Sequence, residues 1–245
     1  MRTLLDRAFT YLMLPIAGPQ ALWLRWRASG LPEAAGPRRG RLGNGPELRL
    51  MVLGDSSAAG VGSERQDRAV GGHLARRLSN AGFLVDWQIV ATTGHTTRDV
   101  LRRLEGMASE PLDVVVICLG VNDAKNGVRE WLWRRRMSGI LDHLTDRFGA
   151  KLIVISGLPP LAQFPLLPWP LRYILGARTA RFDRGLAGMA DARDNCLHVP
   201  LDVVIEPDKM AADGFHAGPQ MHAIWARILI RAMTPRLPFA VAKSS

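Results

Sequence analysis

The sequence predicts a single three-layer α/β/α domain, in which helices cover both faces of a parallel sheet. The chain has 245 residues, 47% of them hydrophobic, which is enough for one large domain with its own core. Short runs rich in Val and Ile alternate with longer segments in which apolar residues recur every three or four positions. Because the short runs lack polar alternation, we expect them to be strands buried on both faces, as parallel strands are.

Five apolar runs predict the strands of this sheet. They span residues 48–53, 84–90, 113–120, 151–156 and 196–201. Five segments with helical periodicity predict the covering helices, at residues 67–81, 97–107, 126–148, 176–193 and 219–233. Their alternation favours a five-stranded parallel sheet. Ligands bind such sheets beyond the carboxyl ends of the strands, so chemistry is expected there.

The chain divides into three parts around this sheet. Residues 1–46 hold an apolar segment and then a connector rich in Gly, Pro and Arg. Residues 47–235 hold all the predicted strands and helices, and residues 236–245 form a C-terminal tail. The two cysteines cannot supply a disulfide framework or a four-thiolate zinc site, so packing must hold the domain together.

The apolar segment at residues 8–24 has two interpretations. Its 17 residues are interrupted by Pro15 and Pro19, which argues against a regular membrane-spanning helix. One interpretation is a helix and turn packed on the domain; the other is an interfacial helix on a membrane surface. Aromatic and basic residues suited to lipid headgroups lie in or beside it: Trp23, Trp26, Arg2, Arg7, Arg25 and Arg27.

Charge composition raises the question of a polyanionic partner. Lys and Arg number 32 against 22 for Asp and Glu, a formal net charge of +10, which would suit nucleic acid or an anionic membrane. The arginines are scattered and no DNA-binding motif is evident, so we expect no nucleic-acid partner. Two scattered cysteines favour the cytoplasm, with membrane association through the N-terminal segment as an alternative and without excluding export. The sequence does not predict an oligomeric state.

Two of the predicted strands end in short glycine-containing turns. The first is followed by GDSSAAG at 54–60, a tight turn of small residues that leaves the hydroxyl of Ser56 accessible. This turn lacks the lysine of a P-loop and the third glycine of a dinucleotide-binding fingerprint. The alternative for Ser56 is a helix N-cap. The second strand is followed by Gly94, where no side chain obstructs approach to the backbone, and by His95.

The third strand and the last predicted helix are flanked by further polar residues. GVND at 120–123 brings the Asn122 amide, which can donate to an oxyanion, although Asn122 and Asp123 can also form a turn and cap a helix. DGFH at 213–216 precedes the final helix. A carboxylate such as Asp213 can hold one imidazole nitrogen of His216 and leave the other as a general base.

Together these stretches resemble the blocks of the SGNH superfamily, also called GDSL esterases and lipases. GDSSAAG is similar to the first block, Gly94 falls where the second-block glycine is expected, GVND matches the third, and DGFH is similar to the fifth. The first block reads GDSS rather than GDSL, and Ala217 stands where proline is common.

The resemblance implies the SGNH hydrolase fold, which is flavodoxin-like, and a set of roles. Ser56, Asp213 and His216 would be catalytic. The oxyanion hole would consist of the backbone N–H groups of Ser56 and Gly94 and the side-chain amide of Asn122. The carboxylates of Asp55 and Asp123 would support the loops through hydrogen bonds. No metal and no cofactor are expected.

The implied function is hydrolysis of carboxylic esters, of lipids or of small acyl groups, through an acyl-enzyme on Ser56. An acyltransferase or a carbohydrate O-acetyl esterase with the same site is the alternative. A metal-dependent phosphohydrolase is less favoured, because only one histidine is well placed among its candidate ligands. Those ligands would be Asp55, Asn122, Asp123, Asp213 and His216.

Residues 157–171 carry five prolines and many apolar residues. They predict either a wall or lid of an apolar acyl pocket or a simple cover for the core. Trp131 and Trp133 precede three arginines and indicate a pocket mouth, a lipid surface or a helix with a basic outer face. The candidate substrate-binding residues are His95, Phe164, Trp169 and Phe215.

Overall fold

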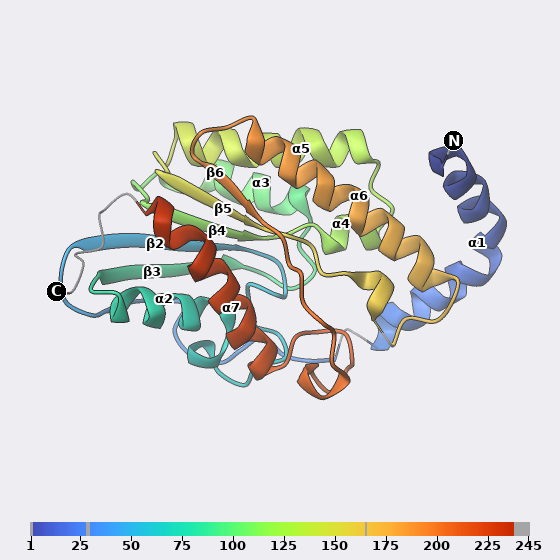
Figure 1. Ribbon diagram of the computed structural model, residues 1–245, viewed down its shortest axis with the longest axis horizontal. Coiled ribbons are helices and arrows are strands. Elements are labelled where there is room, and N and C mark those ends of the chain that lie inside the picture. Colours follow the sequence, from blue (N-terminus) through green and yellow to red (C-terminus); the bar gives the residue numbers. More distant parts are fainter. Residues whose placement is uncertain (1, 28–29, 165, 238–245) are drawn as a thin grey trace.

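A mostly parallel six-stranded sheet forms the centre of the computed structural model, which describes residues 2–27, 30–164 and 166–237 (Figure 1). Its strands are β1 (Arg39–Leu42), β2 (Glu47–Gly54), β3 (Leu84–Ala91), β4 (Val114–Cys118), β5 (Leu152–Ser156) and β6 (Cys196–Val199). The spatial order is β1-β3-β2-β4-β5-β6, and β2 to β6 pair in parallel. These five are the predicted strands, so the predicted fold class is confirmed.

The sixth strand, β1, lies where the sequence predicts a connector. It runs antiparallel to β3, with Arg39 opposite Gln88 and Leu42 opposite Val85. Its sequence, RGRL, has no apolar period and is mostly exposed. Pairing with the edge of β3 therefore makes it a strand, and its arginines suit an exposed sheet edge. At the other end of the chain, residues 238–245 of the predicted tail lie outside the described residues.

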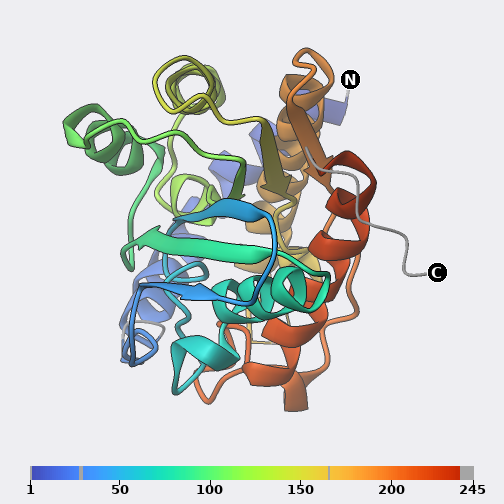
Figure 2. The ribbon, with the colours of Figure 1, turned by 90° about the vertical axis from the view of Figure 1, so that its left-hand side faces the viewer.

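Helices cover both faces of the sheet, as the end view in Figure 2 shows. They are α1 (Arg2–Arg27), α2 (Val70–Asn80), α3 (Thr97–Gly106), α4 (Val121–Lys125), α5 (Glu130–Asp146), α6 (Leu171–Asp191) and α7 (Pro219–Met233). Short 3-10 turns are η1 (Gln66–Arg68), η2 (Leu161–Gln163), η3 (Pro207–Lys209) and η4 (Thr234–Arg236). One apolar cluster joins the sheet to α3, α5 and α6, and another joins it to α2 and α7.

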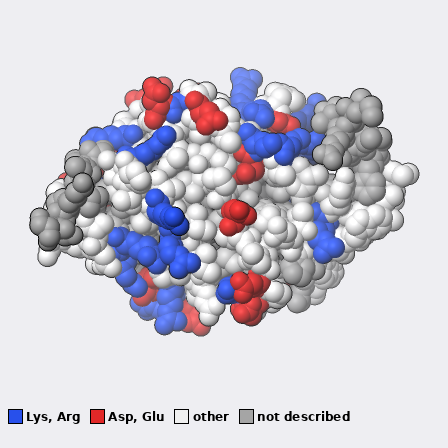
Figure 3. Space-filling model, viewed as in Figure 1, with Lys and Arg blue, Asp and Glu red and all other residues white. Residues whose placement is uncertain are grey.

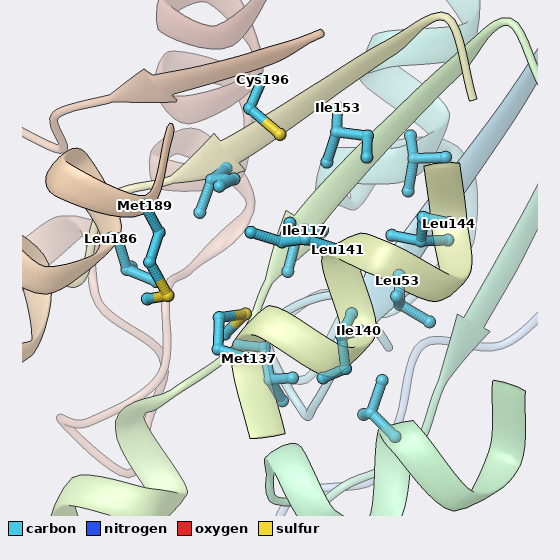
Figure 4. Packing of buried hydrophobic residues seen from close by; sticks show 14 of the residues in the cluster. Leu53, Ile117, Met137, Ile140, Leu141, Leu144, Ile153, Leu186, Met189 and Cys196 are labelled. Carbon is cyan, nitrogen blue, oxygen red and sulfur yellow. The ribbon is translucent and has the colours of Figure 1, made fainter. Parts of the chain in front are cut away.

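Strand β2 shows why the apolar runs lack polar alternation. Met51 and Leu53 belong to the cluster under α5, whereas Leu50 and Val52 belong to the cluster under α2 and α7. Figure 4 shows the first cluster, in which Leu53, Ile117 and Ile153 from neighbouring strands face the apolar side of α5. Each fully buried side chain of this kind contributes about 1.5–3 kcal/mol.

Helices α4 and α6 differ from the sequence prediction. The short α4 was not predicted as a helix; it begins directly after Gly120, whose φ of 131° turns the chain sharply at the end of β4. Helix α6 begins at Leu171, five residues before the predicted start, because the chain can turn helical as soon as Pro170 has been passed. The stretch before it, rich in proline, is irregular apart from η2.

Helix α1 continues through Pro15 and Pro19, where the sequence predicts a helix followed by a turn. Its second half packs on the domain: Ala17 and Leu24 are buried in an apolar cluster with residues of η2 and α6. These contacts stabilise the helix where the prolines weaken it. None of the helices in the described part of the chain is long and apolar enough to cross a membrane.

Trp133 lies inside the protein, which makes its predicted place at a pocket mouth or lipid surface wrong. It is fully buried and stacks on Phe182 of α6 at 4.1 Å between ring centroids. Trp131, two residues earlier on α5, is exposed. The two indoles point to opposite sides because neighbouring positions i and i+2 of a helix do not share a face.

Replacing Trp133 with alanine should lower the free energy of unfolding by about 3–5 kcal/mol, because it leaves a large cavity under Phe182. Trp131→Ala is the matched control and should change it by less than about 0.5 kcal/mol. Urea unfolding followed by circular dichroism measures both. Equal losses in the two variants would contradict the assigned packing.

Candidate active site

The turn that carries Ser56 begins at Gly54, which ends β2 and lies opposite Cys118 at the end of β4. A Cβ atom on Gly54 would lie 2.1 Å from the carbonyl oxygen of Cys118, so only glycine fits there. The chain then turns back on itself, with the N–H of Val61 donating to the carbonyl of Ser56 at 3.0 Å. No helix begins at Ser56, so the alternative role as a helix N-cap is wrong. Ser56 is 8% exposed and faces a cavity.

His216 and Asp213 complete a row of hydrogen bonds that begins at Ser56. The Oγ of Ser56 lies 3.1 Å from Nε2 of His216, and Nδ1 of His216 lies 2.5 Å from Oδ2 of Asp213. The other carboxylate oxygen of Asp213 accepts from the backbone N–H groups of Phe215 and His216, at 2.9 and 3.0 Å. With the carboxylate fixed in this way, Nδ1 carries the proton and Nε2 is left to accept from the serine hydroxyl.

The pKa values of the two nearby aspartates move in opposite directions. Burial tends to raise the pKa of Asp213, but hydrogen bonds from the side chain and N–H of His216 and from the N–H of Phe215 bring it below its ordinary value. Burial raises the pKa of Asp55 to about 6, although the hydrogen bond from the N–H of Ser57 and the positive charge of Lys125 each act to lower it. Asp213 is therefore an anion throughout the neutral range, whereas the carboxyl of Asp55 is about half protonated near pH 6.

Asn122 joins three loops at the same end of the sheet. Its amide nitrogen donates to the carbonyl of His95 at 3.0 Å and lies 3.4 Å from Oδ2 of Asp55. Gly94, next to His95, has a φ of 83°, a conformation that favours glycine even though open space surrounds it. Asn122 therefore ties the turn after β2 and the loop after β3 to the start of α4, beside Ser56.

Asp123 supports the neighbouring helix rather than facing the cavity. Its two carboxylate oxygens accept from the N–H and the hydroxyl of Thr97, at 2.9 and 2.7 Å. Thr97 is the first residue of α3, whose N–H has no partner within the helix. The carboxylate therefore caps α3 from α4 and holds together the loops that follow β3 and β4.

A cavity of about 680 Å³, open to solvent, lies beside Ser56. The polar residues at one end of it are Asp55, Ser56, Ser57, Asn122 and His216. The rest of the lining is Val121, Pro159, Leu161, Phe164, Leu201, Val203, Ile205, Met210, Phe215, Ala217, Met221 and Trp225. The cavity is therefore apolar except next to the serine hydroxyl.

Two of the four predicted substrate-binding residues line this cavity. Phe164 and Phe215 do so and meet edge to face at 5.7 Å. Trp169 lies outside the lining and is 59% exposed, and His95 reaches the site only through its carbonyl oxygen. The structure therefore gives no support to substrate contact by Trp169 or by the His95 ring.

Sequence reasoning missed the wall formed by residues 201–210. Leu201, Val203 and Ile205 line the cavity from an irregular segment that follows β6. Their only signal in the sequence is apolar alternation outside a strand, with no residue that carries chemistry. Trp225 of α7 was missed as well; its indole N–H donates to the hydroxyl of Ser156 at 2.8 Å, which fixes the ring at the cavity.

Within residues 2–27, 30–164 and 166–237, no three His, Cys, Asp or Glu side chains gather where they could share a metal ion. Asp55 and Asp123 have hydrogen-bond partners of their own, and Asp213 is engaged with His216. This arrangement gives no support to the phosphohydrolase alternative, which needs several convergent ligands.

The model of the GDSL-like lipase/acylhydrolase family matches residues 52–224, a stretch that contains every residue of the row and of the three loops. The chain belongs to this family. The predicted resemblance to this family is thereby confirmed.

Individual relatives agree with this assignment. A GDSL-like esterase of Mycobacterium tuberculosis is 28% identical over 203 residues, which cover 78% of this chain and 63% of the relative. This chain therefore spans less than two thirds of the length of that relative.

Solved structures share the fold at low sequence identity. The crystal structure of TesA is 24% identical and aligns with a TM-score of 0.64 over 77% of this chain and 99% of its own. A family 3 carbohydrate esterase of Clostridium thermocellum is 18% identical, with a TM-score of 0.62 over 78% of this chain and 97% of its own. A family 2 carbohydrate esterase of Corynascus thermopiles (Myceliophthora fergusii), 17% identical, aligns with a TM-score of 0.64 over 85% of this chain and 69% of its own.

The raised pKa of Asp55 makes stability depend on pH in a defined way. Its carboxyl binds a proton more tightly in the folded protein, at about 6, than in the unfolded chain, at about 3.9. The stabilisation from that proton is present at low pH and is lost as the pH rises through 6. When the pH is raised from 5 to 8, the free energy of unfolding of the wild type should fall by about 1 kcal/mol more than that of Asp55→Asn. Denaturant unfolding of both proteins at the two pH values tests this, and equal losses would contradict it.

Asp213→Asn should lower kcat about 10³- to 10⁴-fold with little change in KM. The two backbone N–H groups that bind Asp213 would select the amide oxygen, so the amide nitrogen would face His216. Nδ1 of His216 would then accept a hydrogen bond, and its proton would move to Nε2, where it blocks proton uptake from Ser56. Steady-state kinetics on a soluble ester measures this effect. Activity within tenfold of the wild type would show that Asp213 does not set the tautomer.

Proposed function

We propose that this protein hydrolyses carboxylic esters with an apolar acyl group, through an acyl-enzyme on Ser56. The observation that carries the proposal is the row from Ser56 through His216 to Asp213, which opens into the apolar cavity. Nucleophile, base and orienting carboxylate lie within hydrogen-bond distance, the arrangement that activates a serine hydroxyl.

In the first half of the reaction, Oγ of Ser56 bonds to the ester carbonyl carbon while its proton passes to Nε2 of His216. The resulting tetrahedral intermediate breaks its bond to the alcohol oxygen, which takes the proton from Nε2. Water then repeats the sequence, releases the carboxylic acid and restores the serine hydroxyl. Asp213 stays ionised and stabilises the imidazolium in both halves.

The developing oxyanion is assigned to the N–H groups of Ser56 and Gly94 and to the amide of Asn122. The hydrogen bond from Asn122 to the His95 carbonyl supports this role, because it fixes the amide plane with nitrogen toward the site. Loss of one such donor costs about 10²- to 10³-fold in kcat in serine hydrolases.

The lining of the cavity favours acyl chains over sugars as the group bound beside Ser56. Away from Ser56 it offers side chains without hydrogen-bonding groups, apart from the indole N–H of Trp225, which is already bonded to Ser156. Burial of each methylene there contributes about 0.8 kcal/mol. Carbohydrate O-acetyl hydrolysis and acyl transfer with the same residues are the alternatives, since all of them pass through an acyl-enzyme.

A series of p-nitrophenyl esters from acetyl to palmitoyl tests the proposal, with product analysis in the presence and absence of an added alcohol. We expect kcat/KM to rise from acetyl to medium-length chains and to fall at least about 10³-fold in Ser56→Ala. Ser138→Ala, a serine of α5 outside the cavity lining, is the control: it should keep activity and its reaction with a fluorophosphonate, which Ser56→Ala should lose. A preference for acetyl would favour a carbohydrate esterase, and labelling of Ser56→Ala would contradict the assigned nucleophile.

A further inference from the structure

Helix α1 is part of the cavity wall rather than a separate appendage. Its buried residues Ala17 and Leu24 belong to an apolar cluster whose other buried members come from η2, the proline-rich stretch after it, α6 and the segment before α7. Those members are Leu161, Phe164, Leu167, Leu171, Leu175 and Phe215. Three of them, Leu161, Phe164 and Phe215, also line the cavity beside Ser56. One face of α1 therefore supports the side chains that would contact the acyl group.

Gln20 fastens α1 to the start of α6. Its amide nitrogen donates to the carbonyl of Trp169 at 2.9 Å, and its amide oxygen accepts from the N–H of Leu171 at 3.2 Å. Leu171 is the first residue of α6, and no side chain of the preceding residue caps that helix. One side chain thus holds both sides of the junction between the proline-rich segment and α6.

The opposite face of α1 exposes a second apolar stripe. Leu12 is 71% exposed and Trp26 is 76% exposed, and Ile16, Leu22 and Trp23 are exposed as well. At 100° per residue these five positions fall within an arc of about 120°, roughly opposite the arc that holds Ala17 and Leu24. A helix on the surface of a soluble domain needs only one apolar face, which packs on the core. A second apolar face that is exposed to solvent therefore indicates a binding surface.

The neighbouring segment exposes aromatic residues as well. Trp169, whose carbonyl accepts from Gln20, is exposed, and so is Tyr173, two residues after Leu171. Figure 1 shows α1 at one end of the molecule, beside the start of α6, with its N-terminal half extending away from the body. Apolar and aromatic residues of α1 and of the α6 junction are thus exposed at one end of the protein, next to the cavity wall.

The chemistry of this surface suits a lipid membrane. Between Arg7 and Arg25 the helix has no charged residue, and four arginines against one aspartate give it a formal charge of +3. Tryptophan and tyrosine favour the level of the headgroups, and arginines are attracted to anionic ones. Because α1 is not apolar enough over its length to span a bilayer, it would lie in the plane of the interface.

We propose that the stripe of Leu12, Ile16, Leu22, Trp23 and Trp26, with Trp169 and Tyr173, docks on the surface of an anionic lipid membrane. The inference rests on the proposed function, since it makes esters dissolved in that membrane the substrates. Docking places the lipid next to the wall that Leu161, Phe164 and Phe215 share between α1 and the cavity. An ester can then pass from lipid to Ser56 without crossing bulk water.

Co-sedimentation of the full chain with vesicles tests the docking surface. Wild type should bind vesicles of phosphatidylcholine with phosphatidylglycerol more tightly than phosphatidylcholine alone, and salt should weaken the binding. The variant Leu12→Ser/Leu22→Ser should bind the anionic vesicles at least about tenfold more weakly than the wild type does. Leu42→Ser, an equally apolar exposed change on β1, is the control and should bind as wild type does.

Activity separates docking from catalysis in the same proteins. Leu12→Ser/Leu22→Ser should keep wild-type turnover of a soluble short-chain ester, which also shows that it folds, and should lose turnover of an ester held in vesicles. Ser56→Ala should bind vesicles as the wild type does while losing both activities. Failure of Ser56→Ala to lose activity would overturn the proposed function alone.

Two results would overturn the docking proposal while leaving catalysis intact. One is vesicle binding that is absent in the wild type or unchanged in Leu12→Ser/Leu22→Ser. The other is a dimer, seen by light scattering, that the same double substitution converts to a monomer without any binding to vesicles. In that case a second copy of the chain covers the stripe.

Discussion

The close contact between β2 and β4 at Gly54 is the constraint on which the site depends. The missing side chain lets the carbonyl of Cys118 lie against the end of β2, where it accepts from the N–H of Asp55 at 3.2 Å. The two strands therefore end side by side, and the turns that follow them carry Ser56 and Asn122 into contact with the same cavity. Any side chain at position 54 would clash with the carbonyl of Cys118 and push these two turns apart.

His216 reaches this place from 160 residues further along the chain than Ser56, and packing on the turn of Ser56 holds it there. A Cβ atom on Gly62 would lie 2.2 Å from the carbonyl oxygen of Ala217, the residue after His216. On α7, Nε2 of His222 lies 3.3 Å from the carbonyl oxygen of Val61. These contacts with the turn of Ser56 offset the conformational entropy that is lost when the loop around His216 is ordered.

The surface charge has no comparable organisation. On the face shown in Figure 3, basic side chains are spread out with acidic ones among them. Several arginines of the described residues form ion pairs, as Arg193 does with Asp142. Scattered, partly neutralised arginines give little of the continuous field that a polyanion requires. The expectation of no nucleic-acid partner therefore stays a prediction that the charge distribution favours.

Residues with distinctive chemistry or strong periodicity could be predicted from the sequence, and residues that depend on tertiary contacts could not. The parallel strands were found because both of their faces are buried, and Ser56, Asn122, Asp213 and His216 because their types and spacing are specific. Strand β1 forms through its pairing with β3, and no local pattern in its sequence predicts a strand there. The same holds for the wall around Val203 and for Trp133, whose burial depends on Phe182 from another helix.

The bonds between Asp123 and Thr97 have a consequence for the energetics of turnover. The backbone at Asn122 cannot shift away from the cavity without moving Asp123, and that movement would expose the first N–H of α3 and a buried carboxylate. With its amide also bonded to the His95 carbonyl, Asn122 is oriented when the protein folds, and under the proposed mechanism it would not have to be reorganised when charge develops on a substrate oxygen. In this protein, the stability of a helix that touches no substrate is coupled to the rigidity of the group that would receive the oxyanion.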